Sequence, residues 1–110
     1  MEASDGHIHV EAQGDAAAVR NVLAAAFGLV GTLSAEAGTG CGLRVARAFV
    51  SPHPERVTCL PCREHARDQH LRLADQLDQL AGRPGPFVDR VRMERAAAHH
   101  REQARRFTAP

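Results

Sequence analysis

A pair of cysteines separated by two residues constrains this chain more than any other feature of its sequence. Cys59 and Cys62 enclose a Leu-Pro dipeptide, and at this spacing both sulfur atoms can reach one ion. A zinc ion takes four nitrogen or sulfur ligands in a tetrahedron, with a Zn–S distance of about 2.3 Å. The sequence therefore predicts a CxxC knuckle that binds zinc and supplies half of its ligands.

Histidines near this pair are candidates for the other ligands. His65 lies three residues after Cys62, about one helical turn further on, and is the preferred third ligand. His99 is the preferred fourth ligand, because a helical hairpin would return it toward the start of the first helix. The alternatives that stay open for this position are His100, His70, Cys41 and His53.

The apolar residues predict only a thin core. Hydrophobic residues make up 44% of the 110 residues, but the chain has no Trp, no Tyr and only four Phe. A core built mainly of Ala, Val and Leu buries little surface, so a bound metal or a second subunit would add needed stability. The composition therefore agrees with a metal site and leaves a homodimer open.

The pattern in residues 1–50 predicts a β-α-β-β arrangement. Residues 7–12 alternate polar and apolar side chains, which is the period of a half-buried strand. Residues 16–27 carry apolar side chains at helical spacing. Residues 29–34 and 43–50 read as two further strands, joined in a hairpin by a glycine-rich loop. We expect a three-stranded layer with one helix against a face.

The rest of the chain predicts a knuckle followed by two helices. Residues 51–61 form a proline-rich linker that ends in the knuckle, and 62–110 form an antiparallel helical hairpin. Its first helix extends to about Ala81, and its second helix extends from Phe87 to about Phe107. The whole chain is thus expected to be one domain of the α+β class.

The first predicted strand carries a second arrangement that could bind metal. His7, His9 and Glu11 point to the same side of that strand. An HxH pair on a strand can bind a metal ion, but a row of polar residues on a solvated face is far commoner. We therefore expect these side chains on a solvated surface.

The C-terminal part of the chain is rich in arginine. Residues 83–110 contain seven arginines and three acidic residues, which favours contact with nucleic acid or an acidic protein. The alternative interpretation is a solvated helix with mixed charges. The arginines that we expect on the contact surface are Arg95, Arg101, Arg105 and Arg106.

The cysteine pair also supports a redox interpretation. The five residues from Cys59 to Arg63 resemble the CxPC active site of thioredoxin-like oxidoreductases. The resemblance implies that Cys59 is an attacking thiolate, with its pKa lowered by the helix N-terminus, and that Cys62 resolves the mixed disulfide. The family's fold also needs two later strands and a cis-proline, whereas the 48 residues after Cys62 read as helix, turn and helix.

Taken together, these patterns favour a zinc-stabilised binding module without enzymatic activity. The alternatives are a thiol-disulfide redox protein and a metal-free interaction domain that acts as a homodimer. No P-loop or dinucleotide fingerprint is present. The first residues lack the basic and apolar regions of a signal peptide, so we expect a cytoplasmic protein with no membrane partner.

Overall fold

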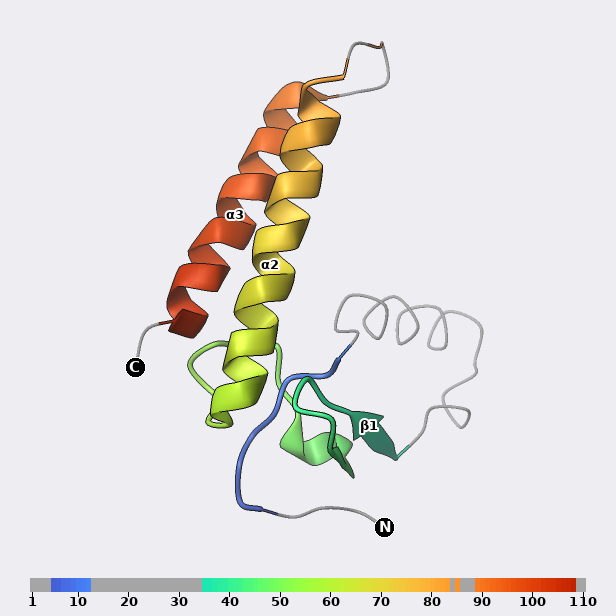
Figure 1. The fold of residues 1–110 in the computed structure, drawn as a ribbon, viewed down its shortest axis with the longest axis vertical. Helices are drawn as coiled ribbons and strands as arrows, with labels where there is room; N and C mark the ends of the chain where they lie inside the picture. Colours follow the sequence, from blue (N-terminus) through green and yellow to red (C-terminus); the bar gives the residue numbers. More distant parts are fainter. Residues whose placement is uncertain (1–4, 13–34, 84, 86–88, 109–110) are drawn as a thin grey trace. The chain divides into compact units, whose positions relative to one another are not determined.

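The computed structural model describes residues 5–12, 35–83, 85 and 89–108 (Figure 1). The chain divides into two compact units, Met1–Arg63 and Glu64–Pro110. The first unit holds a two-stranded antiparallel sheet, and the second holds most of two helices. The mixed α+β class predicted from the sequence is confirmed.

The sheet is a short hairpin. Strand β1 (Glu36–Gly38) pairs with β2 (Arg44–Ala46), and the central pair, Ala37 and Val45, is buried. Gly42 in the connecting turn has a φ of +91°, which favours glycine. The hairpin differs from the predicted one, because β1 lies in the stretch expected to be loop. Burial of Ala37 outweighs the turn signal of its glycine-rich surroundings.

The predicted strand 43–50 is also shorter than expected. Strand β2 ends at Ala46, and a single 3₁₀ turn, η2 (Arg47–Phe49), follows it. The expected helix 16–27 and strand 29–34 lie outside the described residues. Within the described part of the chain, the sheet has two strands rather than the expected three.

The N-terminal segment, residues 7–12, runs as extended chain between the hairpin and the residues after η2. It forms isolated bridges, His9 with Val50 and Glu11 with Thr39, instead of a regular ladder. His9 and its neighbour Val10 are both buried, so the alternation predicted for a half-buried strand does not hold. The segment is enclosed on both sides because two different stretches of chain pair with it.

Helix α2 (Leu60–Ala81) begins in the first unit and continues into the second. Pro61 lies in its first turn, where the missing N–H costs no helical hydrogen bond. The backbone N–H groups of Thr58 and Cys59 donate to the Ile8 carbonyl at 3.1 and 3.2 Å. These bonds tie the start of α2 to the N-terminal segment.

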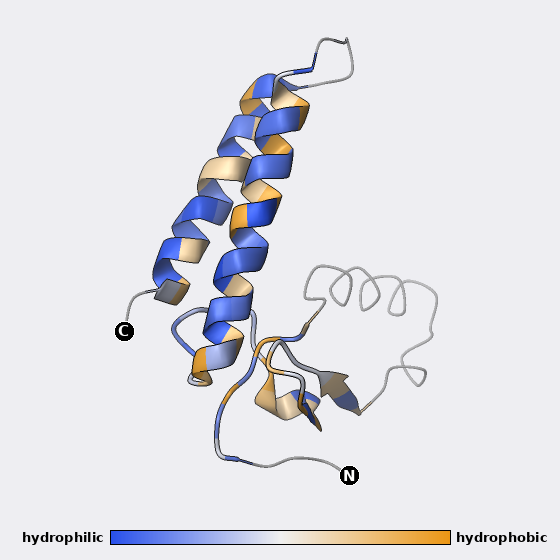
Figure 2. Ribbon diagram, viewed as in Figure 1, coloured by the Kyte–Doolittle hydropathy of each residue, from blue (hydrophilic) through white to orange (hydrophobic). Residues whose placement is uncertain are grey.

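The second unit is a hairpin of α2 and α3 (Arg90–Thr108), in which the helices run antiparallel (Figure 1). Five buried alanines are spaced at seven or eight residues along each helix: Ala66, Ala74, Ala81, Ala97 and Ala104. Hydrophilic residues predominate on both helices in Figure 2. His100 lies against His70, three residues from the predicted register, because α3 begins later than expected and the connection is longer.

Candidate metal centre

Four potential metal ligands converge in the first unit. His9, Cys41, Cys59 and Cys62 each offer one ligand atom, and these atoms all lie within 4.8 Å of one another. The four residues therefore lie close enough to hold one metal ion. They come from the N-terminal segment, the turn between β1 and β2, and the start of α2.

The distances around His9 match those between ligands of one zinc ion. The Nδ1 atom of His9 lies 3.4 Å from the Cys62 sulfur and 3.5 Å from the Cys41 sulfur. Tetrahedral zinc with ordinary Zn–N and Zn–S bonds separates nitrogen and sulfur ligands by about 3.6 Å. The side chains of His9 and Cys62 are fully buried, with 0% exposed, so water does not compete for these atoms.

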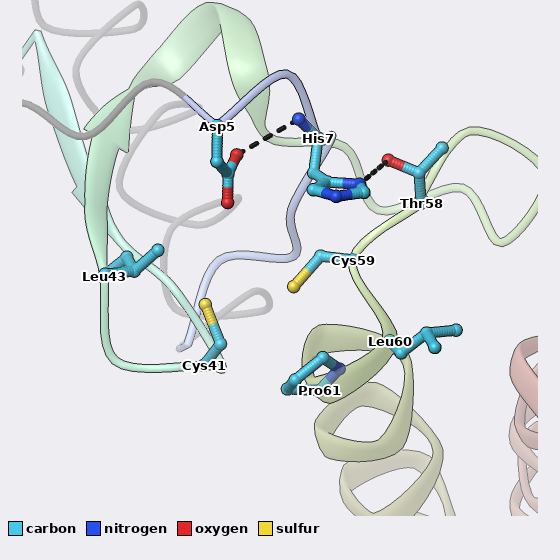
Figure 3. A pocket seen from close by; sticks show the side chains of 8 residues that line it. All are labelled: Asp5, His7, Cys41, Leu43, Thr58, Cys59, Leu60 and Pro61. Atoms are coloured by element: carbon cyan, nitrogen blue, oxygen red, sulfur yellow. Dashed lines mark hydrogen bonds between the residues drawn. The ribbon is translucent and has the colours of Figure 1, made fainter.

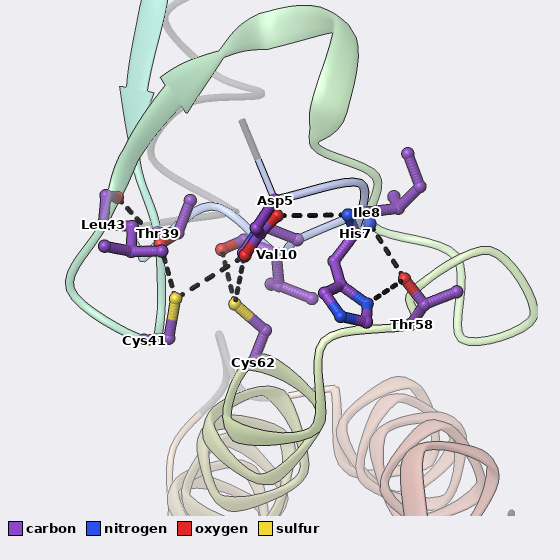
Figure 4. Close-up of polar contacts among 10 residues, drawn as sticks. Asp5, His7, Ile8, Val10, Thr39, Cys41, Leu43, Thr58 and Cys62 are labelled. Atoms are coloured by element: carbon purple, nitrogen blue, oxygen red, sulfur yellow. Dashed lines mark hydrogen bonds and ion pairs between the residues drawn. The ribbon is translucent and has the colours of Figure 1, made fainter. Parts of the chain in front are cut away.

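A carboxylate orients the imidazole from its other side. The Nε2 atom of His9 lies 3.0 Å from Asp5 Oδ1, which directs Nδ1 toward the sulfurs. Asp5 also accepts a hydrogen bond from the His7 backbone N–H (Figure 4). This arrangement of carboxylate, histidine and ligand position is typical of protein metal sites. Burial alone lowers the pKa of His9, but hydrogen bonds with Asp5 and Cys41 outweigh it, and the pKa is raised.

The contact with His9 also shifts the pKa of Asp5. Hydrogen bonds from the His9 side chain and from the His7 backbone N–H lower the pKa of Asp5. Asp5 is therefore a carboxylate at neutral pH and can accept a hydrogen bond from a protonated His9 Nε2. The tautomer that this contact favours leaves the lone pair of Nδ1 available to a metal.

Cys41 lies in the hairpin turn, where several polar groups surround its sulfur. The Thr39 hydroxyl is 3.1 Å from the Cys41 sulfur. Burial alone raises the pKa of this thiol, but hydrogen bonds with the Thr39 side chain and the Leu43 backbone lower it to about 7. The turn is therefore suited to a thiolate.

The thiol of Cys59 has a raised pKa, in contrast to that of Cys41. It is 7% exposed, and burial raises the pKa of its thiol to about 12, although the Cys62 backbone N–H opposes this shift. The redox interpretation implied a lowered pKa for Cys59, and the direction found is the reverse. Desolvation and the neighbouring sulfurs outweigh the helix N-terminus, so a cation would be needed to stabilise this thiolate.

The structure brings together only some of the predicted ligands. Cys59 and Cys62 belong to the group of four, whereas His65 and His99 are not among its members. His65 is half-buried on α2, and His99 is exposed on α3. His100, an alternative to His99, instead places its Nδ1 atom 2.7 Å from Nδ1 of His70.

Two members of the group were not the preferred ligands. Cys41 was an alternative for the fourth position, and its place between two glycines in a tight turn was the signal that could have favoured it. His9 was expected on a solvated strand face, and it is buried instead. Its burial depends on pairing with residues near positions 39 and 50, which no local pattern reveals.

A pocket of about 390 Å³ adjoins the group of four (Figure 3). The sulfur atoms of Cys41 and Cys59 both point into it, whereas Cys62 is not one of its lining residues. The other residues that line it are Asp5, His7, Leu43, Thr58, Leu60 and Pro61. The pocket gives small molecules a route to two of the three sulfurs.

The predicted arginine surface lies on α3, and all four of its arginines are exposed. Arg101 forms ion pairs with Asp75, at 3.6 Å, and with Asp78. Arg105 pairs with Glu102 at 2.6 Å. Part of the positive charge is therefore already matched by carboxylates of the same unit, and such exposed pairs contribute little stability.

Two further findings bear on function. None of the helices in the described part of the chain has the length and apolar character needed to cross a membrane. Comparison of the sequence with models of known protein families, with curated proteins and with solved structures found no match. The chemistry of the group of four is therefore the guide to function.

Proposed function

We propose that the chain is a zinc-stabilised binding module, in which His9, Cys41, Cys59 and Cys62 hold one structural zinc ion. The observation that carries this proposal is the spacing of His9 Nδ1 from two sulfurs, at 3.4 and 3.5 Å. Four protein ligands close the coordination shell, and closed shells of sulfur and nitrogen are typical of structural zinc sites, whereas catalytic sites keep one position open.

The rest of the first unit explains why a metal would be needed. In the residues that the structure describes, its sheet has two strands of three residues each, with isolated bridges from residues 7–12, and so small a sheet is marginally stable at best. The buried apolar residues described around the ligands are of small or medium size, Val10, Val45 and Val57 among them. Zinc would join the stretches of chain that carry the ligands at one point, so binding and folding would be coupled.

The ligand set favours zinc over other ions. Three thiolates and one imidazole suit zinc, whereas magnesium and calcium prefer oxygen ligands. The three cysteines are free thiols, which agrees with the proposed location in the reducing cytoplasm. The raised pKa of Cys59 disfavours the attacking thiolate that the alternative redox function would need.

The binding role is proposed for α3. Two of its exposed arginines, Arg101 and Arg105, already donate to carboxylates of Asp75, Asp78 and Glu102. An acidic protein or a nucleic acid would therefore compete for the same guanidinium groups. If the partner is nucleic acid, affinity should fall steeply with salt, since counterions are released from phosphates. The homodimer alternative is supported by large apolar side chains that are exposed on the helices: Leu71, Leu80 and Val91.

The metal content of three histidine variants tests the proposed site. Protein purified without added metal should contain about one zinc per chain, measured by elemental analysis. His9→Ala should lose most of this zinc, whereas His65→Ala and His99→Ala should retain it. Retention of zinc by His9→Ala, with loss in His65→Ala, would favour the ligand set predicted from the sequence instead.

A further inference from the structure

The three sulfurs of the proposed site differ in access. Cys41 is half-buried and shares the pocket with Cys59. Cys62 is fully buried, and its sulfur faces His9 Nδ1 at 3.4 Å and the Val10 carbonyl at 3.9 Å. A small molecule that enters the pocket therefore meets Cys41 and Cys59, and it does not meet Cys62.

From this arrangement we infer that Cys41 and Cys59 form an oxidation site, at which a small peroxide converts the pair into a disulfide and releases the metal. The inference rests on the proposed zinc site. It differs from the expectation for a CxxC motif, in which the two cysteines of the motif form the disulfide.

The chemistry requires hydrogen peroxide as the only co-reactant. The Cys41 thiolate attacks one peroxide oxygen, so that an S–O bond forms and the O–O bond breaks. The sulfur is oxidised to a sulfenic acid, and the leaving hydroxide takes up a proton to become water. The Cys59 thiolate then attacks the Cys41 sulfur, so that an S–S bond forms and the S–O bond breaks. A second hydroxide leaves and is protonated to water.

The disulfide would remove two of the four ligands at once. Only His9 and Cys62 would stay available, and two ligands do not complete the tetrahedral shell that a structural zinc requires. Each sulfur of a disulfide has lost the negative charge that binds the metal. A thiol reductant would reverse the step by exchange and restore both ligands.

Access to the pocket should set the rate. Leu60 lines the pocket and is 72% exposed, so Leu60→Trp should narrow the approach without altering a ligand. Leu71 lies on α2, is 42% exposed and does not line the pocket, so Leu71→Trp is the matched control. We expect several-fold slower zinc release for Leu60→Trp, an unchanged rate for Leu71→Trp, and full zinc content in both.

The experiment treats zinc-loaded protein with one equivalent of hydrogen peroxide, follows zinc release with a chromogenic chelator, and maps the disulfide. Cleavage after arginine leaves Cys59 and Cys62 on one peptide, Val57–Arg63, and Cys41 on another. A crosslink between these peptides, with Cys62 alkylated as a free thiol, is expected. Zinc release should follow formation of this crosslink and reverse when reductant and zinc are added.

Different outcomes separate this inference from the proposed function. A disulfide between Cys59 and Cys62 with Cys41 free, or zinc that stays bound after the crosslink forms, would overturn the inference and leave the zinc site standing. Protein that never holds zinc would overturn the proposed function and, with it, the release of metal. Equal rates for Leu60→Trp and Leu71→Trp would show that the pocket is not the route.

Discussion

Each of the two units of this chain is stabilised internally by a different kind of contact. In the second unit, two long helices bury small residues at regular intervals, Ala97 and Ala104 on α3 among them. In the first unit, β1 and β2 have three residues each, and four side chains from separate stretches of chain meet at one point. Helical periodicity can specify the second unit, whereas the first depends on contacts between residues far apart in the sequence.

Removal of metal should have the largest effect, and it should affect the first unit far more than the second. Structural zinc contributes about 10–16 kcal/mol of apparent binding free energy in small zinc modules at neutral pH, more than the total stability of many domains. A chelator should therefore abolish amide protection around β1, β2 and residues 7–12, while α3 keeps its protection. Hydrogen exchange resolved by residue measures both.

Equal loss of amide protection in both units would contradict the prediction that only the first unit depends on zinc. A chelator that leaves β1 and β2 protected would instead contradict the zinc-dependent fold. A suitable control is the same chelator loaded with zinc beforehand, which should change neither unit.

Acidification should weaken the first unit through its ligands. Because the pKa of Cys59 is about 12, zinc must displace its proton at every pH below that value, so affinity falls as pH falls. Cys41, with a pKa of about 7, adds a second displaced proton only below about pH 7. A plot of log Kd against pH should therefore steepen below that point, measured by competition with a chromogenic chelator.

A variant at Thr39 should shift the pH at which this bend occurs. Thr39→Val removes the hydroxyl that favours the Cys41 thiolate, so the bend in the plot should move to higher pH. A bend that stays in place would show that the Thr39 side chain does not set the pKa of Cys41.

Overpacking should affect only the second unit. Ala97 is fully buried on α3, and a larger side chain there would force the helices apart. Ala97→Leu should cost about 1–3 kcal/mol of unfolding free energy, measured by urea denaturation. Zinc content should stay the same, and Ala98→Leu, at the exposed neighbouring position, is the matched control with little expected loss.

An effect of comparable size is expected from Asp5, the carboxylate that contacts the His9 ligand. Asp5→Asn removes the charge that supports His9 and should weaken zinc binding about 10- to 100-fold. Asp75→Asn removes a carboxylate of the second unit and should leave zinc affinity unchanged. If the two variants bind zinc equally well, Asp5 has no role in orienting the imidazole.

The sequence was most informative where structure is local. Helix α2 ends at Ala81 as predicted, because apolar spacing and the following glycine are read within a few residues. Cys59 and Cys62 could be nominated as ligands because the motif is contiguous. Cys41 and His9 could not be preferred, since chain pairing alone brings them to the motif, and a buried histidine beside a buried valine has no period that indicates its position.

The separation of the ligands along the chain also has a consequence for biosynthesis. His9 and Cys62 are 53 residues apart, so on a ribosome the histidine leaves the exit tunnel before Cys62 does. The three thiols span only residues 41–62 and can capture an ion first, since shorter loops cost less entropy to close. The His9 imidazole, already outside the tunnel, would then complete the shell.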